Sequence, residues 1–234
     1  MRKAIFIIFS LILIIFTSGC IQEKESGLEN SVVNKELEES NSEEDKFFDK
    51  DGTKYLNYTI EEKIYTTHAY PHLLPSMEWI RETTPESSVF LNWWDYGHLI
   101  IGYAERGTII YSPSEDILWS LASGRWNTEG GGEFSTREQI DDVALALSTI
   151  DPKVAKTIMK KYNANYLFVT RQESETSYVI FTIAGLDVSE YVEDYQPKEK
   201  AFETILFKAI NREEISGFEL VYEDESAIIY HIVE

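Results

Sequence analysis

The chain has little cysteine, little positive charge and no long apolar run, and each shortage excludes a class of protein. Cys20 is the only cysteine among 234 residues, so one chain forms neither a disulfide framework nor a cysteine metal site. Lysine and arginine number 21 against 41 aspartates and glutamates, which gives a net charge of −20 at pH 7. A surface this acidic repels nucleic acid and anionic lipid headgroups. Any attachment to the membrane is therefore expected to come from a lipid and not from surface charge.

The N-terminus has the pattern of an export signal. Arg2 and Lys3 precede an apolar run over residues 4–16, which is shorter than the ~20 residues of a membrane span and suits a signal peptide. The small residues 17–19 then lead to Cys20, which resembles the cleavage site of a lipoprotein, although a threonine stands where leucine is usual. We expect cleavage of residues 1–19 and lipidation of Cys20. The alternative is a plain signal peptide or an uncleaved anchor.

Composition divides the rest of the chain into a tether and a globular part. Residues 20–58 are rich in Glu, Asn, Ser and Lys, a composition that buries too little apolar surface to offset chain entropy. We expect a lipid-anchored flexible linker there and one folded domain over residues 59–234. Asn57 begins an Asn-Tyr-Thr triplet, the acceptor sequence for N-glycosylation, so Asn57 is a candidate glycosylation site.

The globular part alternates between strand and helix patterns. The Ser135–Glu138 segment is a capping box before a helical apolar face, and Asp151-Pro152 begins another helix. Residues 176–187 fit helix and strand equally. The expected helices cover residues 75–82, 98–104, 114–122, 136–147, 152–162 and 202–209, the expected strands cover 88–92, 108–111, 166–169, 218–222 and 227–233, and a glycine-rich loop covers 124–134. This order predicts an α/β fold, a single mixed-sheet domain with flanking helices.

The most informative stretch is Trp93-Trp94-Asp95-Tyr96-Gly97. Aromatic walls exclude water, and a carboxylate among them accepts a strong hydrogen bond from a hydroxyl or an amide. The five residues and their flanks resemble the signature of the catalytic subunits of oligosaccharyltransferases, the STT3, AglB and PglB group. Residues 79–89, His98, the Glu105-Arg106 step and residues 159–170 resemble the same family. The resemblance covers about residues 75–170.

The resemblance implies a role in recognising the acceptor peptide. In that family the Trp-Trp-Asp face holds the Ser or Thr two residues after the acceptor asparagine. Trp93, Trp94 and Asp95 are thus expected to bind a hydroxyl, with Tyr96 and Gly97 shaping a turn and His98 beside them. The alternative is that the motif is retained only for packing.

The same comparison argues against catalysis by this chain alone. The family's catalytic acids and metal ligands lie in a multi-span membrane region, and this sequence has no apolar run of 18 residues. The family's second motif, Asp-x-x-Lys followed by Met or Ile, is not matched by Asp151 and the lysines that follow it. We therefore expect no catalytic residue, no metal and no cofactor. His68 and His72 are four residues apart, but Pro71 lies between them, which favours a surface loop over a metal site.

These observations predict a non-catalytic domain on the extracytoplasmic face of the membrane, anchored by lipid on Cys20. It would bind Ser- or Thr-containing peptides or a membrane protein of the glycosylation machinery, and no nucleic acid. Two alternatives remain: a structural surface lipoprotein with a vestigial motif, or one part of a split oligosaccharyltransferase.

Overall fold

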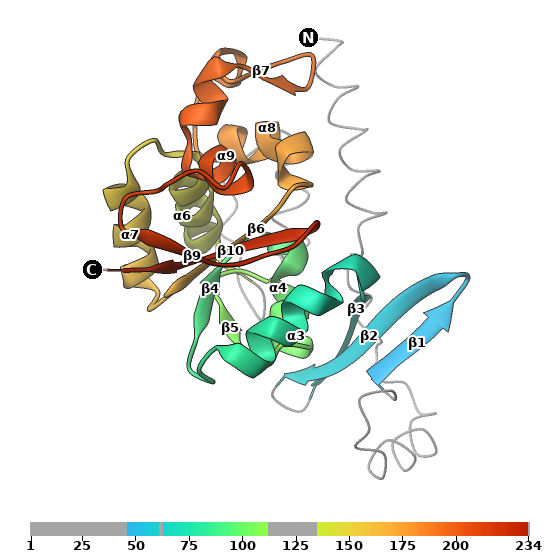
Figure 1. The fold of residues 1–234 in the computed structure, drawn as a ribbon. Helices are drawn as coiled ribbons and strands as arrows, with labels where there is room; N and C mark the ends of the chain where they lie inside the picture. The colour runs from blue at the N-terminus through green and yellow to red at the C-terminus, as the bar shows by residue number, and fades with distance from the viewer. Residues whose placement is uncertain (1–45, 61–62, 112–134, 234) are drawn as a thin grey trace, which may run out of the picture. The chain divides into compact units, whose positions relative to one another are not determined.

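The computed structural model describes residues 46–60, 63–111 and 135–233 (Figure 1). The chain divides into two compact units, Met1–Leu74 and Pro75–Glu234. The expected helix over 114–122 and the loop over 124–134 lie outside the described residues, as does Cys20. Within the described residues, no helix has the length and apolar character needed to cross a membrane.

The first unit contains an antiparallel sheet of three strands, β1 (Phe47–Lys50), β2 (Thr53–Ile60) and β3 (Lys63–His68), in that order. The strands differ from the flexible linker expected up to residue 58. Alternate residues explain the difference, because Leu56 and Tyr58 are buried and Tyr58 stacks on its cross-strand partner Tyr65 with ring centroids 5.6 Å apart. Such cross-strand aromatic pairs stabilise sheets. A 3-10 helix, η2 (Pro71–Leu73), follows.

The second unit is built on a five-stranded sheet in the order β5-β4-β6-β10-β9. Strand β4 pairs in parallel with β5 and β6, whereas β10 pairs antiparallel with β6 and β9. The sheet is therefore mixed, as the sequence predicts. Its strands are β4 (Val89–Leu91), β5 (Gly107–Thr108), β6 (Tyr166–Thr170), β9 (Phe218–Glu223) and β10 (Ala227–Ile232).

Six α-helices are described with this sheet. Helices α6, α8 and α9 pack against one another, and α9 also contacts β6 and β10, so these helices cover one face of the sheet (Figure 1). The six are α3 (Leu74–Thr83), α4 (Trp94–Gly102), α6 (Arg137–Ser148), α7 (Pro152–Lys161), α8 (Glu173–Ile183) and α9 (Ile205–Ile210). A short excursion between α8 and α9 contains η3 (Val188–Glu190), β7 (Val192–Glu193), β8 (Gln196–Pro197) and η4 (Glu199–Glu203).

Helix ends follow the sequence closely, with one shift. Asp151 caps α7 through the Lys153 backbone N–H, with Pro152 in the first turn, as predicted. The capping box of α6 uses Thr136 and Gln139, one residue later than predicted. The shift arises because the Ser135 hydroxyl accepts a hydrogen bond from the Tyr111 N–H instead, at 3.0 Å.

Other boundaries also differ from the predictions. Residues 176–187, which fitted helix and strand equally, belong mostly to α8, and the helix expected over 202–209 is divided between η4 and α9. The strand expected over 108–111 is reduced to Gly107–Thr108. The helix expected over 98–104 begins four residues earlier, at Trp94.

Candidate functional site

The aromatic motif forms the start of helix α4. Strand β4 ends at Leu91, Trp93 is extended with φ −75° and ψ 153°, and the helix begins at Trp94. Tyr96 and Gly97 therefore lie within a helix and do not form the expected turn. Asp95 lies in the first turn, where backbone N–H groups lack intrahelical acceptors. Its carboxylate accepts from its own N–H group.

Burial separates Asp95 from the other motif residues. Trp93, Trp94, Tyr96 and His98 are 1%, 6%, 3% and 4% exposed. Gly97 is buried as well, so Asp95, which is partly buried, is the one residue of 93–98 that is not fully buried. The two indoles pack on each other with ring centroids 4.2 Å apart. The indoles thus belong to the core, and Asp95 is the residue of the motif that is most open to solvent.

The surroundings of Asp95 alter its acidity. Desolvation by the neighbouring protein atoms raises the pKa of Asp95 to about 7, and the hydrogen bond from its backbone N–H offsets this in part. The carboxyl group thus changes charge near neutral pH. Once ionised, the poorly solvated carboxylate is a strong acceptor for a hydroxyl donor.

Asn92 fixes the backbone that carries the motif. Its side-chain amide donates to the carbonyl groups of Trp93 at 2.7 Å and Ile110 at 3.2 Å, and its oxygen accepts from the Thr108 hydroxyl. Asn92 is fully buried, and a buried amide needs such partners. This role is absent from the sequence-based predictions, although a polar residue between a buried strand and an aromatic run was a usable signal.

Tyr96 connects α4 to the end of β6. Its hydroxyl accepts from the Thr170 hydroxyl at 2.9 Å and donates to the Gln172 side-chain oxygen at 3.4 Å. The Thr170 backbone N–H in turn donates to the carboxyl group of Glu173. Polar groups from α4, β6 and α8 therefore meet beside Asp95. The sequence did not predict a site role for Thr170, Gln172 or Glu173.

His98 packs against Tyr111. Its ring meets the Tyr111 ring edge-on with centroids 5.4 Å apart. Burial lowers the pKa of His98 to about 3, so the imidazole is neutral at physiological pH. A neutral imidazole does not attract an anion by charge, but it keeps one N–H group that can donate a hydrogen bond.

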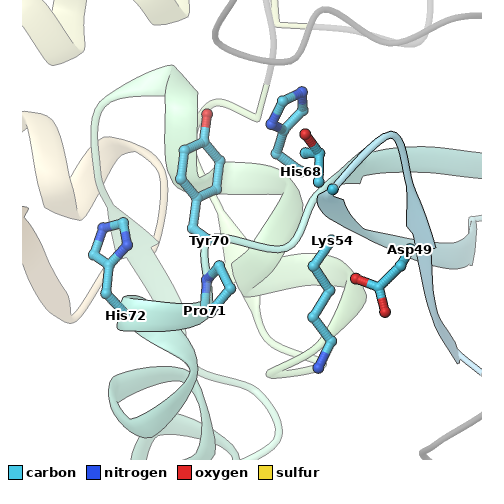
Figure 2. Close-up of a pocket in the computed structure, with 8 residues that line it drawn as sticks. Asp49, Lys54, His68, Tyr70, Pro71 and His72 are labelled. Atoms are coloured by element: carbon cyan, nitrogen blue, oxygen red, sulfur yellow. The ribbon is translucent and has the colours of Figure 1, made fainter.

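His68 and His72 lie in the first unit and line a hollow of about 440 Å³ (Figure 2). The Tyr70 ring lies between the two imidazoles, with centroids 5.9 Å from His68 and 6.1 Å from His72. Burial lowers the pKa of His68. No group of three or more potential metal ligands occurs in the described parts of the chain. Asn57 lies in β2, where its side-chain oxygen accepts from the Thr66 hydroxyl at 2.6 Å.

Comparison with known proteins gives one distant relative by sequence. No protein-family model matches the chain. A segment is 27% identical over 92 residues to the dolichyl-diphosphooligosaccharide–protein glycosyltransferase subunit stt3 of Schizosaccharomyces pombe. The match covers 39% of this chain and 9% of the yeast protein. The chain therefore corresponds to a small part of that relative.

Comparison with solved structures also finds an oligosaccharyltransferase. The C-terminal globular domain of an oligosaccharyltransferase from Archaeoglobus fulgidus superposes with a TM-score of 0.51 at 18% sequence identity. The superposition covers 68% of this chain and 95% of that domain. The chain thus has the fold of the C-terminal globular domain of an archaeal oligosaccharyltransferase and is a distant homologue of stt3.

Proposed function

We propose that this protein is a non-catalytic, extracytoplasmic domain that binds Ser- or Thr-containing peptide segments through Asp95. The observation that carries the proposal is the position of Asp95, the one residue of the buried motif that is only partly buried. A carboxylate there accepts a hydrogen bond from a hydroxyl, and the buried indoles that precede it in the chain are apolar surfaces that exclude water. The fold shared with an oligosaccharyltransferase domain supports a role accessory to protein N-glycosylation.

Peptide titration tests this proposal. A hydrogen bond to a charged group contributes about 1.5 kcal/mol or more, so a peptide with Asn-Ala-Thr should bind about tenfold more tightly than one with Asn-Ala-Ala. Binding is measured by NMR shift changes of the labelled protein, because affinities are expected in the millimolar range. The titration is done at pH 8, where Asp95 is mostly ionised. Equal affinity for the two peptides, or no binding of either, would remove hydroxyl recognition.

We further propose that lipid on Cys20 holds the domain at the membrane. One lipid chain anchors weakly, and the acidic surface gives no electrostatic attraction to anionic lipids. In cells, Cys20→Ser should therefore move the protein from the membrane fraction to the soluble or precursor fraction. Unchanged membrane recovery of a processed Cys20→Ser protein would contradict lipid anchoring at this residue.

The burial of Trp93 and Trp94 favours a second function, in which the motif serves only as a structural element of the domain. If the motif is only a structural element, Asp95 has no ligand and its desolvation is a cost to the fold. Asp95→Asn should then stabilise the protein at pH 8 without altering the binding of any peptide. The proposed function instead requires that Asp95→Asn weaken binding of the Thr peptide.

A further inference from the structure

The three-stranded sheet of the first unit has one buried face and one face that is partly open. Along β2, Leu56 and Tyr58 are buried. The residues that alternate with them, Tyr55, Asn57 and Thr59, are partly buried or exposed. Because alternate side chains of a strand point to the same face of its sheet, these three residues share the partly open face.

An aromatic row, formed by Phe48, Tyr55 and His68, crosses the open face. The three residues are cross-strand partners at one level of the sheet, one from each strand. The ring centroids of Phe48 and Tyr55 are 5.4 Å apart, and those of Tyr55 and His68 are 4.9 Å apart. Phe48 is 37% exposed. Apolar surface gathered in this way on an open face commonly marks a place where another group packs.

The acceptor triplet for N-glycosylation, Asn57-Tyr58-Thr59, lies beside the aromatic row and is the only Asn-x-Ser/Thr triplet in the sequence. Asn57 follows Tyr55 by two residues on the same face, about 7 Å along the strand. Strand β1 ends opposite Leu56, so within the described residues Asn57 and Thr59 pair with β3 only. The triplet therefore lies at a partly open edge of the sheet as well as on its open face.

A hydrogen bond from the neighbouring strand orients the Asn57 side chain. The Thr66 hydroxyl donates to the amide oxygen, Oδ1, at 2.6 Å. An N-linked sugar is carried by the amide nitrogen, Nδ2, and leaves Oδ1 as an acceptor. A modified Asn57 can therefore keep this bond, and the bond fixes the direction in which Nδ2 points.

We infer that Asn57 carries an N-linked saccharide and that the first sugar of this saccharide packs on the aromatic row. In the transfer, Asn57 Nδ2 forms a bond to the anomeric carbon of a sugar diphosphate, and the bond from that carbon to the diphosphate oxygen breaks. The diphosphate leaves with the electron pair, and Nδ2 gives one proton to a base of the transferring enzyme. The exporting cell supplies the sugar diphosphate and the enzyme. The inference does not depend on peptide binding by Asp95.

The aromatic row suits a sugar that is held in place by a covalent bond. A sugar ring exposes C–H groups on its faces, and these pack on aromatic rings while the hydroxyl groups stay in water. Such contacts are weak one by one, so a free sugar would bind poorly. Attachment to Asn57 keeps the first sugar beside Tyr55 at a high effective concentration, which makes weak contacts sufficient.

Mass spectrometry tests the modification on the full chain, purified from cells that export the protein and N-glycosylate their own proteins. The peptide that contains Asn57 should carry the added mass of a saccharide. Asn57→Gln and Thr59→Ala should each remove this mass, whereas Thr59→Ser should keep it, because serine retains the hydroxyl of the acceptor triplet. An unmodified Asn57 in exported wild-type protein would overturn the inference.

Hydrogen exchange of the β2 amide groups tests the contact between the sugar and the aromatic row. Glycosylated wild type should open about three- to tenfold less often than unglycosylated Thr59→Ala from the same cells. In a Tyr55→Ala background this ratio should fall close to one, whereas Tyr195→Ala, which changes an exposed tyrosine of the second unit, should leave it unchanged.

Nuclear Overhauser effects between the first sugar and the Tyr55 ring provide a readout in wild type, which does not require the Tyr55→Ala variant to fold. Their presence would support the contact. A glycosylated protein that lacks them, and whose β2 amides exchange as in Thr59→Ala, would show that the sugar does not pack on the aromatic row.

Discussion

Replacement of Gly97 by alanine is expected to destabilise the domain strongly. A Cβ atom at Gly97 would lie 2.2 Å from the Tyr111 Cα and 2.3 Å from the Ile110 carbonyl oxygen. Both are backbone atoms, so no side chain can rotate away. Overpacking of a closed core costs about 1–3 kcal/mol and occasionally more, and a clash with backbone belongs at the upper end. Urea unfolding should show a loss of about 3 kcal/mol or more.

Two features make this prediction informative. Gly97 lies inside helix α4, where alanine ordinarily stabilises by about 0.5–1 kcal/mol relative to glycine. A loss of stability in Gly97→Ala would therefore point to close contact, and a gain would point to helix propensity. Gly185→Ala is the matched control, because Gly185 has a positive φ of 74° and a Cβ added there would meet no atom within 4 Å. The control should cost only about 1 kcal/mol. A Gly97→Ala protein as stable as wild type would refute the close approach.

Replacement of Arg106 by lysine is expected to have the second largest effect. Arg106 is 8% exposed, and its guanidinium donates to the carbonyl groups of Arg81 and Thr84 at the end of α3. It also donates to the carbonyl groups of Ala104 and Glu105 after α4. The last carbonyl groups of a helix lack intrahelical donors, and one planar guanidinium satisfies several at once. Lysine has no such fork and should lose about 2–4 kcal/mol in urea unfolding.

An exposed arginine provides the control for Arg106. Arg212 forms an ion pair with Glu223 across the surface, and its side chain is 33% exposed. Exposed ion pairs contribute about 0–1 kcal/mol, so Arg212→Lys should change the free energy of unfolding by less than about 1 kcal/mol. If Arg106→Lys and Arg212→Lys lower the free energy of unfolding equally, the buried hydrogen bonds of Arg106 contribute no more than an exposed ion pair.

Local signals predicted much of the fold. The Asp151-Pro152 start of α7 and the apolar spacing of α6 depend on neighbouring residues alone, and both appear in the structure. The closing hairpin, β9 and β10, also follows from adjacent apolar runs around residues 224–226. These elements are determined by residues close together in the chain, so the sequence alone is enough to predict them.

The errors arose where distant residues decide. Tyr96 and Gly97 looked like turn residues, but the hydrogen bonds of Tyr96 to Thr170 and Gln172 and the fit of Gly97 against Tyr111 favour a helix. Most of strand β2 lay within the predicted tether, because its pattern is weak without β3, where Tyr65 pairs with Tyr58 of β2.

The candidate site was half visible in the sequence. The motif and its Asp95 stand out as a local sequence pattern. Asn92 becomes relevant only through its contacts with residues 16 and 18 positions away, and Glu173 only through its burial. Glu173 in particular looks like an ordinary polar residue at the start of a helix. Its importance comes from its depth in the fold, which no local pattern gives.

The central claim is that the Asp95 carboxylate accepts the hydroxyl of a bound Ser or Thr. The most direct measurement is the ratio of affinities for the Asn-Ala-Thr and Asn-Ala-Ala peptides at pH 8, in wild type and in Asp95→Asn. The ratio should be about tenfold in wild type and fall close to one in the variant. A wild-type ratio that persists in Asp95→Asn, or a ratio of one in both proteins, would contradict the claim.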